Sequence, residues 1–145
     1  MTSSLKSFLL FSCLATFMTA CEEQSLDIGG NAESGKKLFK RTCQTCHVLE
    51  PGPKDTRGPN LYGVIGRIAG TAPGYRGYSP SLKSYHDVWT PALLEQYLVH
   101  PAGFLREKLQ DPKAQSRMNV RVKDSKARKD IVAYLAERSD GWSTK

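Results

Sequence analysis

The clearest periodic pattern of apolar and polar positions lies towards the end of the chain. An apolar stripe at the three- and four-residue spacing of a helix is formed by Ala127, Ile131, Tyr134 and Leu135. The stripe predicts a helix from about residue 124 to residue 138 that packs one face into a core. No segment alternates strictly between apolar and polar residues, as a half-buried strand does. The pattern therefore predicts an all-α fold.

Two more helices are predicted on either side of a long segment rich in glycine and proline. Residues 33–43 form a short basic helix, and another helix follows Thr90, which suits an N-cap, and Pro91, which suits the first helical position. Pro101 is expected to end this helix. Residues 51–80 contain 7 Gly and 5 Pro, which excludes long helices and central strands. A loop of this length is tolerable when it wraps a large rigid cofactor.

Residues 1–20 have the layout of a secretory signal peptide, with Lys6 before an apolar run from Phe8 to Met18. The run has 11 residues, whereas roughly 18 to 20 are needed to span a bilayer. The junction MTAC resembles the lipobox of bacterial lipoproteins, which implies cleavage before Cys21 and attachment of lipid to its thiol. Ordinary signal-peptide cleavage, leaving an unmodified thiol, is the alternative.

A flexible tether is predicted for residues 21–32, which are polar, contain a Gly-Gly pair and lack apolar periodicity. Fully extended, the segment after the cysteine would reach about 36 Å. Residues 33–140 are of ordinary size for one domain. We expect this domain to be a monomer in the periplasm, held at a membrane by the lipid.

The chain is basic, with a formal net charge of +7 at pH 7, or +6 once the leader with Lys6 is removed. A cluster in the last part of the chain comprises Arg117, Arg121, Lys123, Lys126, Arg128 and Lys129. Such a face would steer the protein towards acidic docking sites on partner proteins, although a basic helix also serves solubility alone. An exported protein does not meet nucleic acid, so no nucleic-acid partner is expected.

Cys43, Cys46 and His47 form the motif Cys-x-x-Cys-His in the stretch RTCQTCHVLE. A Cys-x-x-Cys pair can be a redox dithiol, half of a zinc site or the attachment point of a covalent cofactor. The other cysteines, Cys13 and Cys21, lie too close to the N-terminus for a zinc site, and no thioredoxin-like strand and helix pattern surrounds the motif. In Cys-x-x-Cys-His, both thiols can bind a haem while the imidazole ligates its iron. The motif predicts one covalently bound haem c.

The second axial ligand decides whether such a haem carries electrons or binds small molecules. Met1 and Met18 leave with the signal peptide, so Met118 is the one thioether of the mature chain. Its neighbours, AQSRMNVRVK, are polar and basic, a setting in which a core methionine would be out of place. His86 and His100 are rival ligands, so residue types favour Met118 and leave the alternatives open.

From about Glu33 to Arg138, the chain resembles the class I c-type cytochromes. The resemblance rests on segments in that family's order, namely GKKLFKRTCQTCH, GPNLYGVIGRIAG, APGYRGYS, Trp89, LLEQYL, Met118 and ARKDIVAYL. It implies the small cytochrome c fold, in which three main helices and long loops wrap one covalently bound haem. It also implies that Met118 is the second axial ligand, opposite His47.

The resemblance implies roles for further residues. Pro59 would offer its carbonyl to the outer ring nitrogen of His47 and so fix the imidazole, while Tyr97 would lie near the ligand sulfur. The residues implied to bind the buried haem propionate are Arg67, Tyr78 and Trp89, with Ser116 in place of the family's usual threonine. Gly35 and Phe39 would lie where the first helix crosses the last, near Ile131 and Tyr134.

A haem iron with a protein ligand on each side has no open position for a substrate, which suits one-electron transfer rather than enzyme catalysis. The sequence therefore predicts a membrane-tethered periplasmic electron carrier of a respiratory chain, between a cytochrome bc-type complex and a terminal oxidase. A fixed electron-transfer subunit of a periplasmic dehydrogenase or oxidase is the alternative. A haem protein that binds small ligands remains open if Met118 is absent from the iron. The segment between Tyr97 and Met118 is longer than in compact members of the family, so the ligand loop is expected to be built differently.

Overall fold

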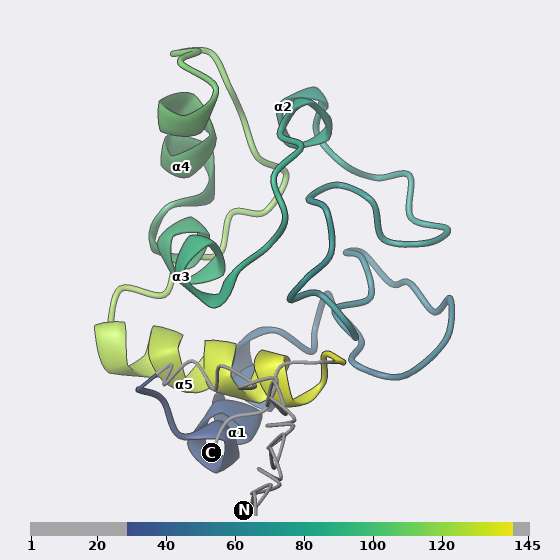
Figure 1. Cartoon of the computed structure of the whole chain (residues 1–145), viewed down its shortest axis with the longest axis vertical. Coiled ribbons are helices and arrows are strands. Elements are labelled where there is room, and N and C mark those ends of the chain that lie inside the picture. Colours follow the sequence, from purple (N-terminus) through teal and green to yellow (C-terminus); the bar gives the residue numbers. More distant parts are fainter. Residues whose placement is uncertain (1–28, 141–145) are drawn as a thin grey trace, which may run out of the picture.

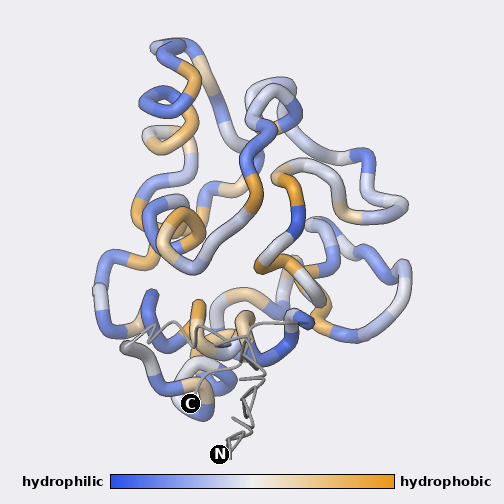
Figure 2. Tube along the Cα trace, viewed as in Figure 1, coloured by the Kyte–Doolittle hydropathy of each residue, from blue (hydrophilic) through white to orange (hydrophobic). Residues whose placement is uncertain are grey.

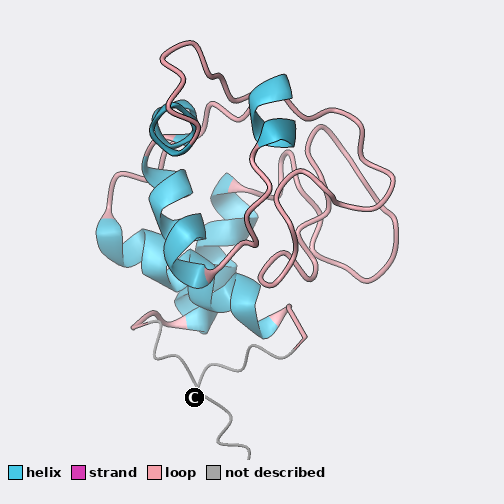
Figure 3. Cartoon of the chain, turned by 45° about the horizontal axis from the view of Figure 1, so that its top comes forward, coloured by secondary structure: helices cyan, strands magenta, loops and turns pink. Residues whose placement is uncertain are grey.

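The computed structural model describes residues 29–140 and contains five helices in that range (Figure 1, Figure 3). In chain order they are α1 (Ala32–Thr42), α2 (Pro80–Ser84), α3 (Pro91–Val99), α4 (Pro101–Lys108) and α5 (Ser125–Glu137). The β-type pairing among these residues is limited to one isolated antiparallel bridge between Ile68 and Val88. The predicted all-α fold is confirmed. The predicted signal peptide, Cys21 and most of the predicted tether lie outside the described residues.

Helices α1 and α5 cross at very short range. Gly35 is buried in the crossing, where a Cβ atom would come within 1.9 Å of the Asp130 carbonyl oxygen and 2.9 Å of Cβ of Tyr134. One turn later, the rings of Phe39 and Tyr134 pack edge to face with their centroids 5.7 Å apart. The crossing therefore requires glycine at position 35, and it lies beside Tyr134 as the family resemblance implied.

The folded domain begins slightly before the boundary predicted at residue 33. Asn31 is the N-cap of α1, and its backbone N–H donates to the Asp130 carboxylate at 2.8 Å. A Cβ atom on Gly30 would come within 2.2 Å of a carbonyl oxygen of α5. Residues 30–32 therefore belong to the domain rather than to the tether.

Helices α3 and α5 begin where the sequence predicted. The Thr90 hydroxyl accepts a hydrogen bond from a backbone N–H of the first turn of α3 at 3.2 Å, and the Asp124 carboxylate does the same for α5 at 2.6 Å. Pro101 follows the end of α3 but also starts α4, which was not predicted. Proline is tolerated at the first position of a helix because the N–H that it lacks would have no partner there.

Side chains, rather than regular structure, hold the long loop between α1 and α2, along which hydrophilic and hydrophobic stretches alternate (Figure 2). The buried Asn60 amide donates to the carbonyls of Glu50 at 2.7 Å and Gly52 at 2.8 Å. The Arg67 guanidinium donates to the carbonyls of Asn60 at 2.9 Å and Tyr62 at 3.2 Å. These bonds satisfy backbone groups that no helix or strand would satisfy. Within residues 29–140, no helix has the length and apolar character needed to cross a membrane.

Candidate functional site

The Cys-x-x-Cys-His motif forms a tight turn at the end of α1. Cys43 is the C-cap of the helix, and its N–H donates to the Phe39 carbonyl at 2.8 Å. The N–H groups of Cys46 and His47 both donate to the Cys43 carbonyl at 3.0 Å. The local backbone therefore brings the two thiols and the imidazole together at the C-terminal end of α1.

The Cys43 thiol is unlike the nucleophile of a redox dithiol. Burial, together with the neighbouring charge of Cys46, raises the pKa of Cys43 to about 11. A catalytic dithiol requires the opposite shift, because its thiolate is the nucleophile. In the part of the chain that the structure describes, no three His, Cys, Asp or Glu side chains gather to hold a metal ion. The raised pKa of Cys43 favours the attachment of a covalent cofactor over the dithiol alternative.

The His47 ring is fixed by the loop that follows the motif. Its Nδ1 lies 2.8 Å from the Pro59 carbonyl oxygen, and it must donate because a carbonyl only accepts. A Cβ atom on Gly58 would come within 2.4 Å of Cε1 of the same ring. Burial lowers the pKa of His47, while the bond to Pro59 acts in the opposite direction. The imidazole is therefore neutral at neutral pH, with Nε2 as the nitrogen left to bind a metal.

Met118 is half-buried against the core and lies at the end of a short hydrogen-bonded chain. The Ser116 hydroxyl accepts from the Met118 backbone N–H at 3.0 Å and lies 2.8 Å from the Tyr97 hydroxyl. Burial raises the pKa of Tyr97, which keeps this phenol protonated. Tyr97 is thus linked through Ser116 to the backbone of Met118, a connection that sequence reasoning did not identify.

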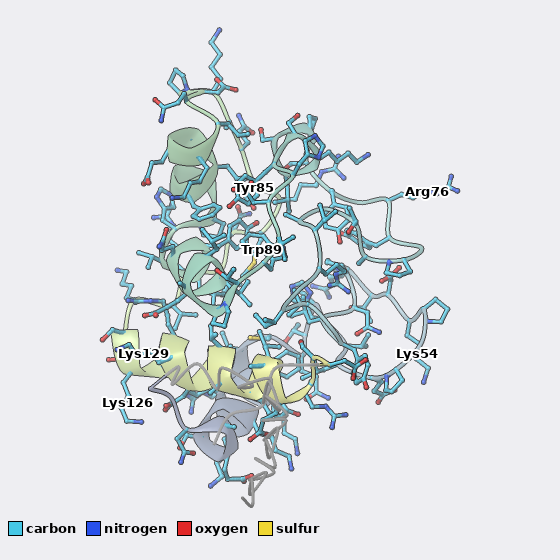
Figure 4. All side chains as sticks on the ribbon, viewed as in Figure 1. Lys54, Arg76, Tyr85, Trp89, Lys126 and Lys129 are labelled. Carbon is cyan, nitrogen blue, oxygen red and sulfur yellow. The ribbon has the colours of Figure 1, made fainter. Side chains whose placement is uncertain are left out.

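Trp89 belongs to a buried aromatic cluster that also contains Tyr85, Tyr97 and Phe104. Figure 4 labels Trp89 and Tyr85. Its ring centroid lies 5.1 Å from that of Tyr97 and 5.7 Å from that of Tyr85. Burial, together with the neighbouring Asp87 carboxylate, raises the pKa of Tyr85 to about 12. The sequence did not single out Tyr85, because no motif or periodic pattern includes it.

Arg67 and Tyr78 are neighbours in the long loop. Burial raises the pKa of Tyr78, and the positive charge of Arg67 partly offsets that effect. The Tyr78 hydroxyl accepts from the Ala72 backbone N–H at 3.1 Å. The structure thus brings together two of the residues that the family resemblance assigned to a buried propionate.

The structure places the two histidines that could rival Met118 as iron ligands, and it shows that one member of the basic cluster points away from the surface. His86 is exposed beyond the end of α2, and His100 lies at the junction of α3 and α4, against Gly103. Arg128, predicted to belong to the basic face, is instead turned inwards. It donates to the Val122 carbonyl at 2.9 Å, and its side chain is 13% exposed.

The other cluster members are exposed, although two of them are already engaged. Lys126 pairs with Asp130 at 2.8 Å, and Arg117 donates to the Gly77 carbonyl at 3.0 Å. The remaining members are Arg121, Lys123 and Lys129. The exposed basic face is therefore smaller than the sequence suggested. Closeness in the sequence does not reveal which basic side chains turn back and bond to backbone carbonyls.

Comparisons with known proteins agree on one family. The family model described as Cytochrome c matches residues 32–139. Over 109 residues the chain is 38% identical to Cytochrome c2 of Pararhodospirillum photometricum, covering 73% of this chain and 96% of that protein. Over 121 residues it is 40% identical to Cytochrome c2 of Rhodovulum adriaticum, covering 77% and 94%. The solved structure of cytochrome c2 from Rhodospirillum centenum superposes with a TM-score of 0.69 at 38% identity, covering 76% and 99% of the two chains.

Proposed function

Because the chain belongs to the cytochrome c family, and so carries one covalently bound haem c through which it transfers electrons, we propose that Cys43 and Cys46 bind this haem and that His47 and Met118 ligate its iron. The thiols would form the thioether bonds, and the imidazole and the thioether would occupy the two axial positions.

The observation that carries this assignment is the fixed position of His47. Its Nδ1–H is committed to the Pro59 carbonyl at 2.8 Å, and the ring lies against Gly58, where a Cβ atom would collide with it. An outer-shell acceptor of this kind orients a metal-bound imidazole and increases its basicity. The fixed ring supports the proposal that His47 binds the iron through Nε2.

Met118 suits the opposite side of the iron. It is the one methionine of residues 29–140, and the bond from its N–H to Ser116 holds its backbone in place. When bound, the haem supplies a couple between ferric and ferrous iron. With both axial positions occupied, no position is open to a substrate, which supports an electron carrier rather than an enzyme, and a thioether ligand raises the reduction potential.

We propose that Arg67, Tyr78 and Trp89 bind the inner haem propionate, as the family resemblance implied. A buried carboxylate requires a cation or hydrogen-bond donors, and the partly buried Arg67 guanidinium lies next to Tyr78. Trp89 is 6% exposed and has an indole N–H to donate. Ser116 was predicted to serve the propionate as well, and this stays a prediction. Its hydroxyl accepts from the Met118 backbone N–H and lies 2.8 Å from the Tyr97 hydroxyl, so we propose that it also supports the ligand side.

We further propose that the protein works in a bacterial periplasm, tethered to a membrane through a lipid on Cys21. The proposal rests on the lipobox-like junction MTAC and on the polar segment that follows it. The electron donor would be a cytochrome bc-type complex and the acceptor a terminal oxidase of a respiratory chain. The protein would bind each partner as a monomer. The exposed cations Arg121, Lys123 and Lys129 would face acidic docking sites on these partners.

Lipid labelling tests the tether. Cells that express the full chain are fed labelled palmitate, and the protein is purified from washed membranes. We expect label in the wild type and none in the Cys21→Ser variant, with the same haem spectrum in both because lipid and haem occupy different residues. An unlabelled wild type would limit the proposal to an electron carrier without an anchor.

Electron delivery tests the function. Ferrous holoprotein is mixed with membranes that contain a terminal oxidase, and its oxidation is followed at rising ionic strength. We expect rapid oxidation that slows with salt. Lys129→Glu should slow it, and Lys54→Glu, on the other side of the molecule (Figure 4), provides a control with the same change of charge. Stable co-purification with one dehydrogenase or oxidase, without exchange between partners, would favour a fixed subunit instead.

A further inference from the structure

The segment that presents Met118 has no regular structure of its own. Residues 109–124, called here the ligand segment, connect α4 to α5 and contain neither helix nor strand. In Figure 1, the segment leaves the end of α4, passes beside α2 and turns towards α5. Its position must therefore be fixed by contacts with neighbouring elements.

Contacts from two other helices hold the part of the ligand segment that precedes Met118. Nε of Arg106, on α4, donates to the Ala114 carbonyl at 3.1 Å. The Ser81 hydroxyl, on α2, accepts from the Gln115 backbone N–H at 3.0 Å. Ala114 is itself 1% exposed. Two helices thus hold consecutive residues three and four positions before the methionine.

Contacts with α3 and α5 hold the part that follows. The Val122 N–H donates to the Leu98 carbonyl at 2.9 Å, and Arg128 donates to the carbonyls of Val122 at 2.9 Å and Lys123 at 2.8 Å. Glu95 lies 3.7 Å from Nε of Arg128. The ligand segment is therefore fastened on both sides of Met118.

We propose that Arg106 and Ser81 are positioning residues that determine how often Met118 leaves the iron. The proposal rests on the assignment of Met118 as an axial ligand. An unfastened loop gains conformational freedom when its ligand dissociates, so each bond to a rigid helix lowers the population of the open state. Helix α4, which was not expected from the sequence, thereby holds the ligand segment in place and keeps the iron closed to small ligands.

Cyanide binding to the ferric holoprotein tests the proposal. At saturating cyanide, the observed rate is limited by dissociation of Met118. We expect this limiting rate to rise about fivefold in Arg106→Ala and in Ser81→Ala, the factor that corresponds to one hydrogen bond. In the double variant the rate should rise above that of either single variant, although the two factors are not expected to multiply because the bonds hold consecutive residues. Ser81→Thr keeps the hydroxyl and should restore the wild-type rate.

Two controls separate positioning from loss of stability. Lys113→Ala removes an exposed side chain from the same segment and should leave the rate unchanged. Ile131→Val, in α5, lowers the free energy of unfolding without removing a hydrogen bond to the ligand segment. If it accelerates cyanide binding as much as Arg106→Ala does, or if Arg106→Ala and Ser81→Ala bind cyanide at the wild-type rate, the positioning role is wrong. A wild type that lacks the near-infrared band of ferric iron bonded to sulfur would instead refute the assignment of Met118.

Discussion

Gly58 lies so close to His47 that a Cβ atom at position 58 would come within 2.4 Å of Cε1 of the imidazole and 2.7 Å of Nδ1. The next residue, Pro59, accepts the hydrogen bond from that Nδ1. One residue thus leaves room for the ring, and the next orients it. Both contacts come from the loop that follows the Cys-x-x-Cys-His motif, not from the motif itself.

Gly58→Ala should therefore displace the His47 ring. Adding a methyl group to a packed site costs about 1–3 kcal/mol, and we expect a lower free energy of unfolding for the holoprotein together with shifted His47 resonances in its NMR spectrum. Urea unfolding measures the first effect. An alanine variant with wild-type stability and unchanged His47 resonances would show that the ring does not depend on this glycine.

Met118→Ala should open the iron or admit another side chain. With no second methionine in residues 29–140, the available replacements are histidines and lysines. We expect rapid binding of carbon monoxide or a lowered reduction potential, because the thioether favours ferrous iron. The covalent haem should persist, since Cys43 and Cys46 are unchanged, and acid-acetone extraction checks this. Rapid carbon monoxide binding by the wild type would contradict the assignment.

Gly35→Ala should destabilise the protein although alanine favours helices. The gain in helix propensity is about 1 kcal/mol, but the new Cβ atom would lie 1.9 Å from the Asp130 carbonyl oxygen, which is backbone and cannot move alone. We expect a clear fall in melting temperature. Gly103→Ala is the matched control, since the new Cβ atom there meets only the movable His100 side chain, 2.5 Å away. Equal melting temperatures for the two variants would rule out a tight α1 and α5 crossing.

Asp130 should make the stability depend on pH in acid. Its pKa lies below the usual 3.8 because Lys126 and the Asn31 N–H donate to its carboxylate, while burial acts in the opposite direction. A carboxyl whose pKa is lower in the folded state stabilises the fold above pH 3.8, and this contribution is lost as the pH falls through the folded-state pKa.

Asp130→Asn should consequently be less stable than the wild type at neutral pH, by about 1 kcal/mol for the weakened hydrogen bonds. The difference should shrink as the pH falls below 3.8 and through the lower folded-state pKa, where the carboxyl of the folded protein becomes protonated. Urea unfolding at neutral and acid pH measures it, with the exposed Asp140→Asn as the control. A difference that is independent of pH would mean that the Asp130 charge does not contribute.

The sequence by itself determined the chemistry of this protein and the outline of its fold. The spacing of Cys43, Cys46 and His47 predicts which atoms bind the haem, because that spacing is a local property of a few covalently linked residues. The helical stripe through Ile131 and Leu135 likewise depends on residues within two turns, so α5 could be predicted. The caps Thr90 and Asp124 are local in the same way.

Only the tertiary structure decided which residues from different elements contact one another. Arg128 looks like part of a basic surface until the chain folds and its guanidinium meets the carbonyls of Val122 and Lys123. Helix α4 begins at Pro101, shortly after α3 ends, and a proline permits either the end of one helix or the start of another. The bond from Arg106 to Ala114 depends on where a helix and a loop meet in space, and no periodicity or motif along the chain encodes that meeting. The local sequence pattern specifies the candidate ligands and most of the helices, whereas the packing between elements specifies which polar groups bond to one another.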